Sequence, residues 1–273
     1  MTGNILTPSA IWGSFKINDT PKTKIVDTTI DGAISFMRLY IDGIRTSKGQ
    51  TEVFALFAKP LNLTNCPSLL LINDFEKEID ISLVKSIVKR GCSVLVISLD
   101  GETDGVEHYT RYPEDLDFAK YKVAKENLFG VPGSAIGTCW FVWACLAKFA
   151  LRYLEKEPSV TGIGLLGMGE ASTVAWQVAG TESNLKCALF ALNAGWAGYR
   201  GIYKYAGMVE PQFSEETYKF IAGIEPQTYA GHVKCPSLVL ASTNSNKFDF
   251  DRIYDTVSKM TTAEYRGATC FSV

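Results

Sequence analysis

The sequence predicts an α/β fold with a mainly parallel central sheet, helices on both faces and an antiparallel N-terminal edge. From Ser68 onward, short apolar runs alternate with amphipathic segments, which is typical of parallel strands joined by helices. Two earlier strand patterns, Ser35–Ile41 and Thr51–Ala58, are separated by turn signals and suit an antiparallel pair. A strand, a glycine-rich turn and an apolar-faced helix follow one another over residues 159–180.

Residues 1–33 are polar, and we expect an N-terminal arm that Trp12 and Phe15 pin to a domain covering residues 34–273. The long polar stretch Asp100–Gly137 predicts a structured excursion over the top of the sheet. The other predicted strands are Leu69–Ile72, Ser93–Leu99, Ile163–Leu166, Cys187–Leu192 and Ser237–Ala241. The predicted helices are Ile79–Arg90, Cys139–Lys156 with Thr138 as cap, Glu170–Ala179, Glu215–Ile221 with Ser214 as cap, and Phe250–Lys259. The tail Ala268–Val273 resembles the opening of one more strand, so the chain is either naturally short or a fragment of a longer one.

Composition narrows the functional classes. The 273 residues are 47% hydrophobic and 21% charged, with a net charge of −2, so nothing favours nucleic acid or an anionic membrane as partner. The seven cysteines are scattered without a CxxC pair, which predicts reduced structural thiols and no metal site. No signal peptide or spanning segment is visible, so we expect a cytoplasmic protein, and no motif calls for a cofactor.

The turn at Gly167-Met168-Gly169-Glu170-Ala171, here called the elbow, has the frame of the G-x-S-x-G nucleophile elbow, with Gly169 in the serine position. Glycine adopts the positive φ of such a turn almost freely, but it carries no hydroxyl. By letter, Gly162-x-Gly164-x-x-Gly167 also matches the dinucleotide fingerprint. Those glycines lie before and inside the predicted strand rather than after it, so we expect no nucleotide site.

Several segments carry a resemblance to α/β-hydrolases that extends over roughly Trp12 to Lys259. The local wording is similar to acetyl-xylan-esterase-like and dienelactone-hydrolase-like members, at Phe54–Pro60, Thr138–Trp143, Glu157–Val160 and Val178–Thr181. The resemblance implies the α/β-hydrolase fold and carboxylic-ester hydrolysis by a Ser, an acid and a His.

The catalytic parts that the resemblance implies are not intact in this chain. The Glu170 N–H would supply one oxyanion donor, and the loop Asn73-Asp74-Phe75-Glu76-Lys77 would supply the other. That loop has no glycine, and its carboxylates either oppose a developing oxyanion or point into water. The position of the acid is Ser245. Of the two histidines, His108 lies too early and His232 precedes the last clear strand.

We therefore expect an inactive or impaired esterase homologue that retains a pocket for a small molecule or carbohydrate ester. Asn73, Asp74, Trp196 and Tyr199 are the candidate binding residues, although packing of a lid onto the sheet is the commoner role of such aromatics. The alternative is an active acetyl-esterase-type hydrolase with a displaced nucleophile. Ser172 is the nearest hydroxyl, but no histidine is placed to activate it.

Overall fold

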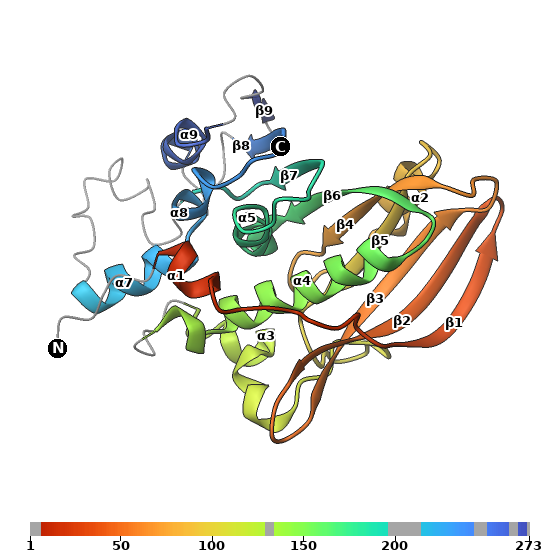
Figure 1. Ribbon diagram of the computed structural model, residues 1–273, viewed down its shortest axis with the longest axis horizontal. Helices are drawn as coiled ribbons and strands as arrows, with labels where there is room; N and C mark the ends of the chain where they lie inside the picture. The colour runs from red at the N-terminus through yellow and green to blue at the C-terminus, as the bar shows by residue number, and fades with distance from the viewer. Residues whose placement is uncertain (1–6, 129–133, 196–213, 243–249, 262–266, 272–273) are drawn as a thin grey trace.

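The structure is a computed structural model of the chain and describes residues 7–128, 134–195, 214–242, 250–261 and 267–271. These residues form one nine-stranded sheet in the order β1-β2-β3-β5-β4-β6-β7-β8-β9 (Figure 1). The strands are β1 Thr23–Asp31, β2 Ile34–Arg45, β3 Gln50–Pro60, β4 Cys66–Ile72, β5 Ser93–Ser98, β6 Val160–Met168, β7 Cys187–Ala191, β8 Ser237–Ser242 and β9 Gly267–Phe271.

The sheet combines an antiparallel N-terminal edge with a parallel remainder. β1, β2 and β3 pair antiparallel, and β3 pairs antiparallel with β5. All further pairs, from β5–β4 through β8–β9, are parallel. The fold class predicted from the sequence is confirmed, and the tail pattern does form a strand, β9. The carboxyl ends of β4 and β6, which are neighbours, bring the loop at Asn73 beside the elbow.

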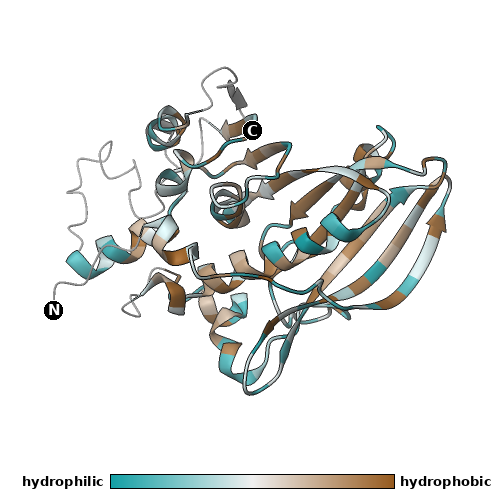
Figure 2. Cartoon of the chain, in the orientation of Figure 1, coloured by the Kyte–Doolittle hydropathy of each residue, from teal (hydrophilic) through white to brown (hydrophobic). Residues whose placement is uncertain are grey.

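Helices cover both faces of the sheet. They are α1 Pro8–Trp12, α2 Ile81–Val88, α3 Tyr121–Ala124, α4 Cys139–Lys156, α5 Ser172–Ala179, α7 Glu215–Ile224, α8 Pro226–Ala230 and α9 Phe250–Ser258, with 3₁₀ turns η1 Glu114–Ala119, η2 Ala135–Gly137 and η3 Gly169–Ala171. The main core lies on the α4 and α5 side and a smaller core lies under α2. Hydrophobic segments accordingly concentrate in α4 and the inner strands (Figure 2).

Two predicted helices have the caps that the sequence indicates. Thr138 accepts the Phe141 N–H at 3.3 Å at the start of α4, and Ser214 accepts the Thr217 N–H at 3.2 Å at the start of α7. The predicted helix Ile79–Arg90 is shorter, because Asp80 caps α2 and the chain leaves the helix before Gly91 at a φ of +88°.

The described part of the predicted N-terminal arm, residues 7–33, contains α1 and the edge strand β1. No alternation of apolar and polar residues indicates β1 in the sequence, because nearly all its side chains are exposed. Trp12 contacts distant parts of the domain, as expected of a residue that pins this segment. Its indole N–H donates to the Tyr229 hydroxyl at 3.1 Å, and its ring contacts those of Phe15 and Phe141.

A buried ionic network lies between α4 and the segment after α5. Lys148 Nζ is 2.7 Å from Glu182 Oε1, and Arg152 reaches the other oxygen of Glu182 at 2.7 Å. The Lys148 and Glu182 side chains are only 5% and 9% exposed. Burial lowers the pKa of Lys148, and the Glu182 carboxylate opposes that shift.

Among the described residues, no helix combines the length and apolar character needed to cross a bilayer.

Candidate functional site

The elbow has the strand, tight turn and helix that the sequence predicts. β6 ends at Met168, η3 turns the chain at Gly169, and α5 begins at Ser172. Gly169 has a φ of +53°, which favours glycine. A Cβ at Gly167 would collide with Ala175 and with the backbone of Ser172, so this glycine permits the close approach of strand and helix. Gly162, Gly164 and Gly167 all lie within β6, which is not the context of a dinucleotide loop.

The Asp74 carboxylate lies directly against the elbow. Its Oδ1 accepts the backbone N–H of Glu170 at 2.9 Å and that of Phe75 at 3.0 Å, and the N–H of Ala171 also bonds to this carboxylate. A Cβ built on Gly169 would overlap all the atoms of the carboxylate group. Asp74 therefore fills the space that a side chain at position 169 would need, and it accepts the N–H groups of the two residues that follow Gly169.

Burial is the main influence on Asp74. It raises the pKa of the carboxyl above its ordinary value, the three backbone N–H donors oppose the rise, and the nearby Glu170 carboxylate adds to it. Of the two loop carboxylates considered from the sequence, Asp74 points into the elbow. Glu76 is exposed, and its side chain pairs with Lys125 at 2.6 Å.

Tyr121 joins the long excursion to the elbow. Its hydroxyl donates to Glu170 Oε2 at 2.6 Å, and its ring stacks on Phe75 with centroids 4.3 Å apart. Burial and the Glu170 carboxylate both raise the pKa of Tyr121, so the phenol stays protonated. The sequence predicts that the excursion crosses the top of the sheet. It gives no local signal for the contact between Tyr121 and Glu170, because the two residues are 49 positions apart.

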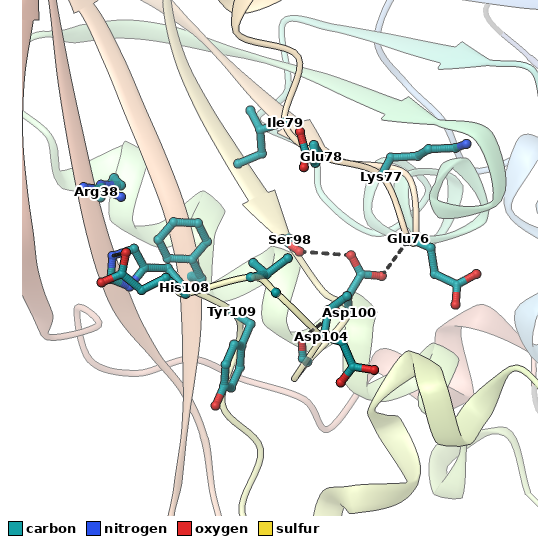
Figure 3. A pocket seen from close by; sticks show the side chains of 16 residues that line it. Arg38, Glu76, Lys77, Glu78, Ile79, Ser98, Asp100, Asp104, His108 and Tyr109 are labelled. Atoms are coloured by element: carbon teal, nitrogen blue, oxygen red, sulfur yellow. Dashed lines mark hydrogen bonds and ion pairs between the residues drawn. The ribbon is translucent and has the colours of Figure 1, made fainter.

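A hollow of about 540 Å³ opens beside the loop after β4 (Figure 3). In Figure 3 the carboxylates of Glu76, Asp100 and Asp104 lie on one side, while Arg38 and His108 lie on the other. Asp100 is buried, and it accepts the Glu76 N–H at 3.0 Å and the Ser98 hydroxyl at 3.2 Å. Its hydrogen bond holds Glu76 at a φ of +55°, a strained conformation for a residue with a side chain.

A second cavity of about 300 Å³ lies next to the elbow and includes Asp74 and Gly169 in its wall. Most of the wall is apolar and comes from β4, β5, α2 and the segment before it, the end of β6 and the residue after β7: Leu71, Ile79, Leu83, Val84, Val96, Met168 and Leu192. Leu192 has a φ of +69°, so backbone strain occurs here as well. Strain of this kind persists where the surroundings enforce it, and it clusters at binding sites.

The fallback nucleophile and the histidines are not brought together. Ser172 is fully buried, and its hydroxyl has no hydrogen-bond partner in the described part of the chain. His108 stacks on Phe54 with ring centroids 5.6 Å apart, and its nearest carboxylate is Glu107, at 3.9 Å. His232 is exposed just beyond α8. No imidazole therefore reaches the Ser172 hydroxyl.

The remaining candidate residues divide into two groups. Asn73 is buried in the cavity wall, and its amide donates to the Lys77 carbonyl at 2.6 Å, which holds the loop in shape. Trp196, Tyr199 and Ser245 lie outside the described residues, so their proposed roles remain predictions from the sequence.

The described residues include both cysteines and potential metal ligands. The six cysteines whose side chains are described, Cys66, Cys92, Cys139, Cys145, Cys187 and Cys235, are free thiols. Burial raises the pKa of Cys139 to about 12, so this thiol is not an activated nucleophile. Across residues 7–128 and the other described ranges, no three His, Cys, Asp or Glu side chains group as metal ligands.

The arrangement of the sheet, the helices and the elbow is that of the α/β-hydrolase fold, and comparison with solved structures agrees. The acetyl xylan esterase from Paenibacillus sp. R4 aligns with a TM-score of 0.62 at 13% identity, covering 97% of this chain and 84% of that one. The glucuronoyl esterase from Solibacter usitatus gives 0.62 at 12% identity, covering 92% and 77%. A cold-adapted esterase from an Arctic intertidal metagenomic library gives 0.61 at 15% identity, covering 91% and 88%.

At such identities the likeness establishes the fold. No protein-family profile matches the chain, and no curated protein is similar to it in sequence. The chemistry of this chain therefore has to be argued from its own residues.

Proposed function

We propose that this chain is an esterase-fold protein that binds a small molecule beside its elbow without hydrolysing an ester. In this proposal Gly169 stands in the position of the nucleophile and supplies no attacking atom. The observation that carries the proposal is the placement of the Asp74 carboxylate, which overlaps the site of a Cβ on Gly169 and accepts the Glu170 N–H. A serine at this position would have no room for its side chain.

The same carboxylate opposes ester hydrolysis electrostatically. An esterase stabilises the oxyanion of its tetrahedral intermediate with backbone N–H donors aimed at the developing charge. The Glu170 and Phe75 N–H groups already bind a negative oxygen of the protein itself. A substrate oxyanion would have to displace that oxygen or develop its charge beside it. Either event raises the activation barrier of ester hydrolysis, which the oxyanion donors of an esterase lower.

The alternative nucleophile, the Ser172 hydroxyl, lacks the surroundings that would activate it. Ser172 has no access to solvent and no hydrogen-bond partner among the described residues, so its hydroxyl lacks a base. Loss of the serine from an intact triad typically costs on the order of 10⁶ in kcat. A protein without it is expected to show no hydrolysis above background. The chain shares its fold with proteins named as an acetyl xylan esterase and a glucuronoyl esterase, and this similarity supports a pocket for a small organic ligand.

Hydrolysis of p-nitrophenyl acetate by the purified full-length chain tests this proposal. We expect a rate equal to that of buffer alone, and an equal rate for the Ser172→Ala variant purified in the same way, which lacks the candidate hydroxyl. Turnover that survives repurification, and is lost in Ser172→Ala or Asp74→Asn, would overturn the proposal.

A further inference from the structure

The cavity beside the elbow combines an apolar interior with a carboxylate of fixed position. Its volume of about 300 Å³ lies at the lower end of the range for ligand pockets. Leu71, Val84 and Val96 line its floor and are buried in the core under α2, so its apolar surface is preformed. Such a space suits a short hydrocarbon chain or a single ring.

The polar groups of the wall give the cavity one chemical preference. The Asn73 side-chain amide donates to the Lys77 carbonyl, and Asp80 caps α2 by accepting the Ser82 and Leu83 N–H groups. Lys77 and Glu78, both exposed, stand at the rim with opposite charges. Asp74 is the carboxylate that two backbone N–H groups hold against the elbow, so its position is preorganised.

The residues in the cavity wall carry a net negative charge, the same sign as the Asp74 carboxylate. Asp74, Glu78 and Asp80 outnumber Lys77 in the cavity wall. The adjoining hollow shares residues 77–79 with this cavity and adds the carboxylates of Asp100 and Glu107, besides those of Glu76 and Asp104, which pair with Lys125 and Lys122. Arg38 in that hollow already pairs with Asp27. The field at the entrance therefore attracts a cation and repels an anion.

We propose that this cavity binds a primary ammonium ion with a short apolar body, its cationic head at the Asp74 carboxylate and its hydrocarbon among Leu71, Leu83 and Val96. The inference rests on the proposed function, since it names the ligand class of the same site. A site that stabilises an oxyanion in an esterase has here become a cation acceptor. Carboxylates and ester carbonyls are excluded because the N–H donors that would bind them are occupied by Asp74.

Isothermal titration calorimetry on the full-length protein tests the ligand class with three probes of equal chain length: n-hexylammonium, hexanoate and 1-hexanol. We expect hexylammonium to bind, and to bind more tightly than hexanol, while hexanoate gives no heat of binding. A hydrogen bond with a charged partner is worth about ten- to hundredfold in affinity, which sets the expected weakening in Asp74→Asn. Glu215→Gln removes the same charge from helix α7, at a side chain that is 82% exposed and lines neither cavity, and should leave the affinity unchanged.

A variant that fills the cavity keeps the test decisive if Asp74→Asn does not fold. Leu83 is half-buried on α2, so Leu83→Trp can project into the cavity without entering the core, and it should abolish hexylammonium binding. Tight binding of hexanoate, equal losses in Asp74→Asn and Glu215→Gln, or no binding of hexylammonium would each overturn the proposal. The esterase assay is independent, so a protein that neither hydrolyses esters nor binds the amine disproves the ligand class alone.

Discussion

The carboxylate of Asp74 accepts the backbone N–H of Glu170 at 2.9 Å, although the two residues are 96 positions apart in the chain. This hydrogen bond ties the loop after β4 to the turn after β6, at the point where neighbouring parallel strands end. In this position the carboxylate leaves no space for a Cβ at residue 169, which is a glycine. Substitutions at positions 74 and 169 should therefore be strongly coupled in their effects on the free energy of unfolding.

A double-mutant cycle measures that coupling. Gly169→Ala adds a Cβ at positive φ, which costs about 1–2 kcal/mol, and forces Asp74 aside, which adds about 1–3 kcal/mol of overpacking. In an Asp74→Ala background the second contribution should vanish, which leaves the backbone cost alone. Guanidinium unfolding of the four proteins gives the coupling free energy.

Gly32 supplies the matched control for the cycle. It has a φ of +58°, and a Cβ there would meet nothing within 4 Å. Gly32→Ala should therefore cost the same in both backgrounds. If Gly169→Ala cost no more than Gly32→Ala in the wild-type background, Asp74 would not occupy the elbow in solution.

Asp100 should give the protein a stability that falls as pH rises. Burial raises the pKa of its carboxyl above the ordinary value of 3.8, the Glu76 and Asp74 charges add to this, and its two hydrogen bonds oppose it. Between 3.8 and the raised pKa the folded state holds a proton that the unfolded state releases, so stability is lost with rising pH across that window. The free energy of unfolding of wild type minus that of Asp100→Asn should fall from pH 4 upward and then level.

A second variant isolates the cause of that pH dependence. Glu76→Gln removes one of the charges that repel Asp100 in the folded state, so the fall should still begin near 3.8 but should end at lower pH. A difference that grows with rising pH would show instead that the folded state favours the ionised Asp100.

Lys148 should contribute more to stability than an ordinary surface lysine. Lys148→Met leaves Glu182 buried with Arg152 as its remaining partner and removes the cation that lies 4.5 Å from the Trp12 ring. Breaking a buried pair costs about 3–5 kcal/mol, and the retained Arg152 places the expected loss near the lower end, about 3 kcal/mol. Lys48→Met, in the pair with Glu114 whose side chains are 60% and 81% exposed, is the comparison and should leave the unfolding midpoint unchanged.

Ser172 should resist serine-directed reagents. Its hydroxyl is buried at the start of α5 and unactivated, so a fluorophosphonate probe is expected to label the native protein no more than the Ser172→Ala variant. Gel fluorescence after brief labelling measures this. Labelling that disappears in Ser172→Ala would restore the displaced nucleophile as a candidate.

Local signals predicted much of the fold. The helix Cys139–Lys156 was predicted with its observed bounds because Thr138 caps its start and Pro158 follows its end. The turn at Gly169 was predicted because glycines, an apolar strand and an apolar-faced helix are all encoded within a few residues. In contrast, β1 forms by pairing with β2 rather than by burying a face, so its side chains carry no pattern.

The site was less predictable because its contacts are long-range. The sequence indicated that Asp74 brings negative charge to the loop after β4, yet an orientation into water was equally consistent with it. Which orientation holds depends on the distant Glu170 N–H and on the missing Cβ of Gly169. Tyr121 and Asp100 reach the site from the excursion, and their residue types alone gave no indication of it.

The indole of Trp12 meets its hydroxyl partner, Tyr229, 217 residues further along the chain. During synthesis on a ribosome helix α1 emerges before α8, so this hydrogen bond can form only after α8 has been made. The contacts of Trp12 with Phe141 and Lys148 become possible earlier, once α4 is complete. Protease resistance near Trp12 in nascent chains of increasing length should therefore rise in two steps, at the lengths that release α4 and then α8.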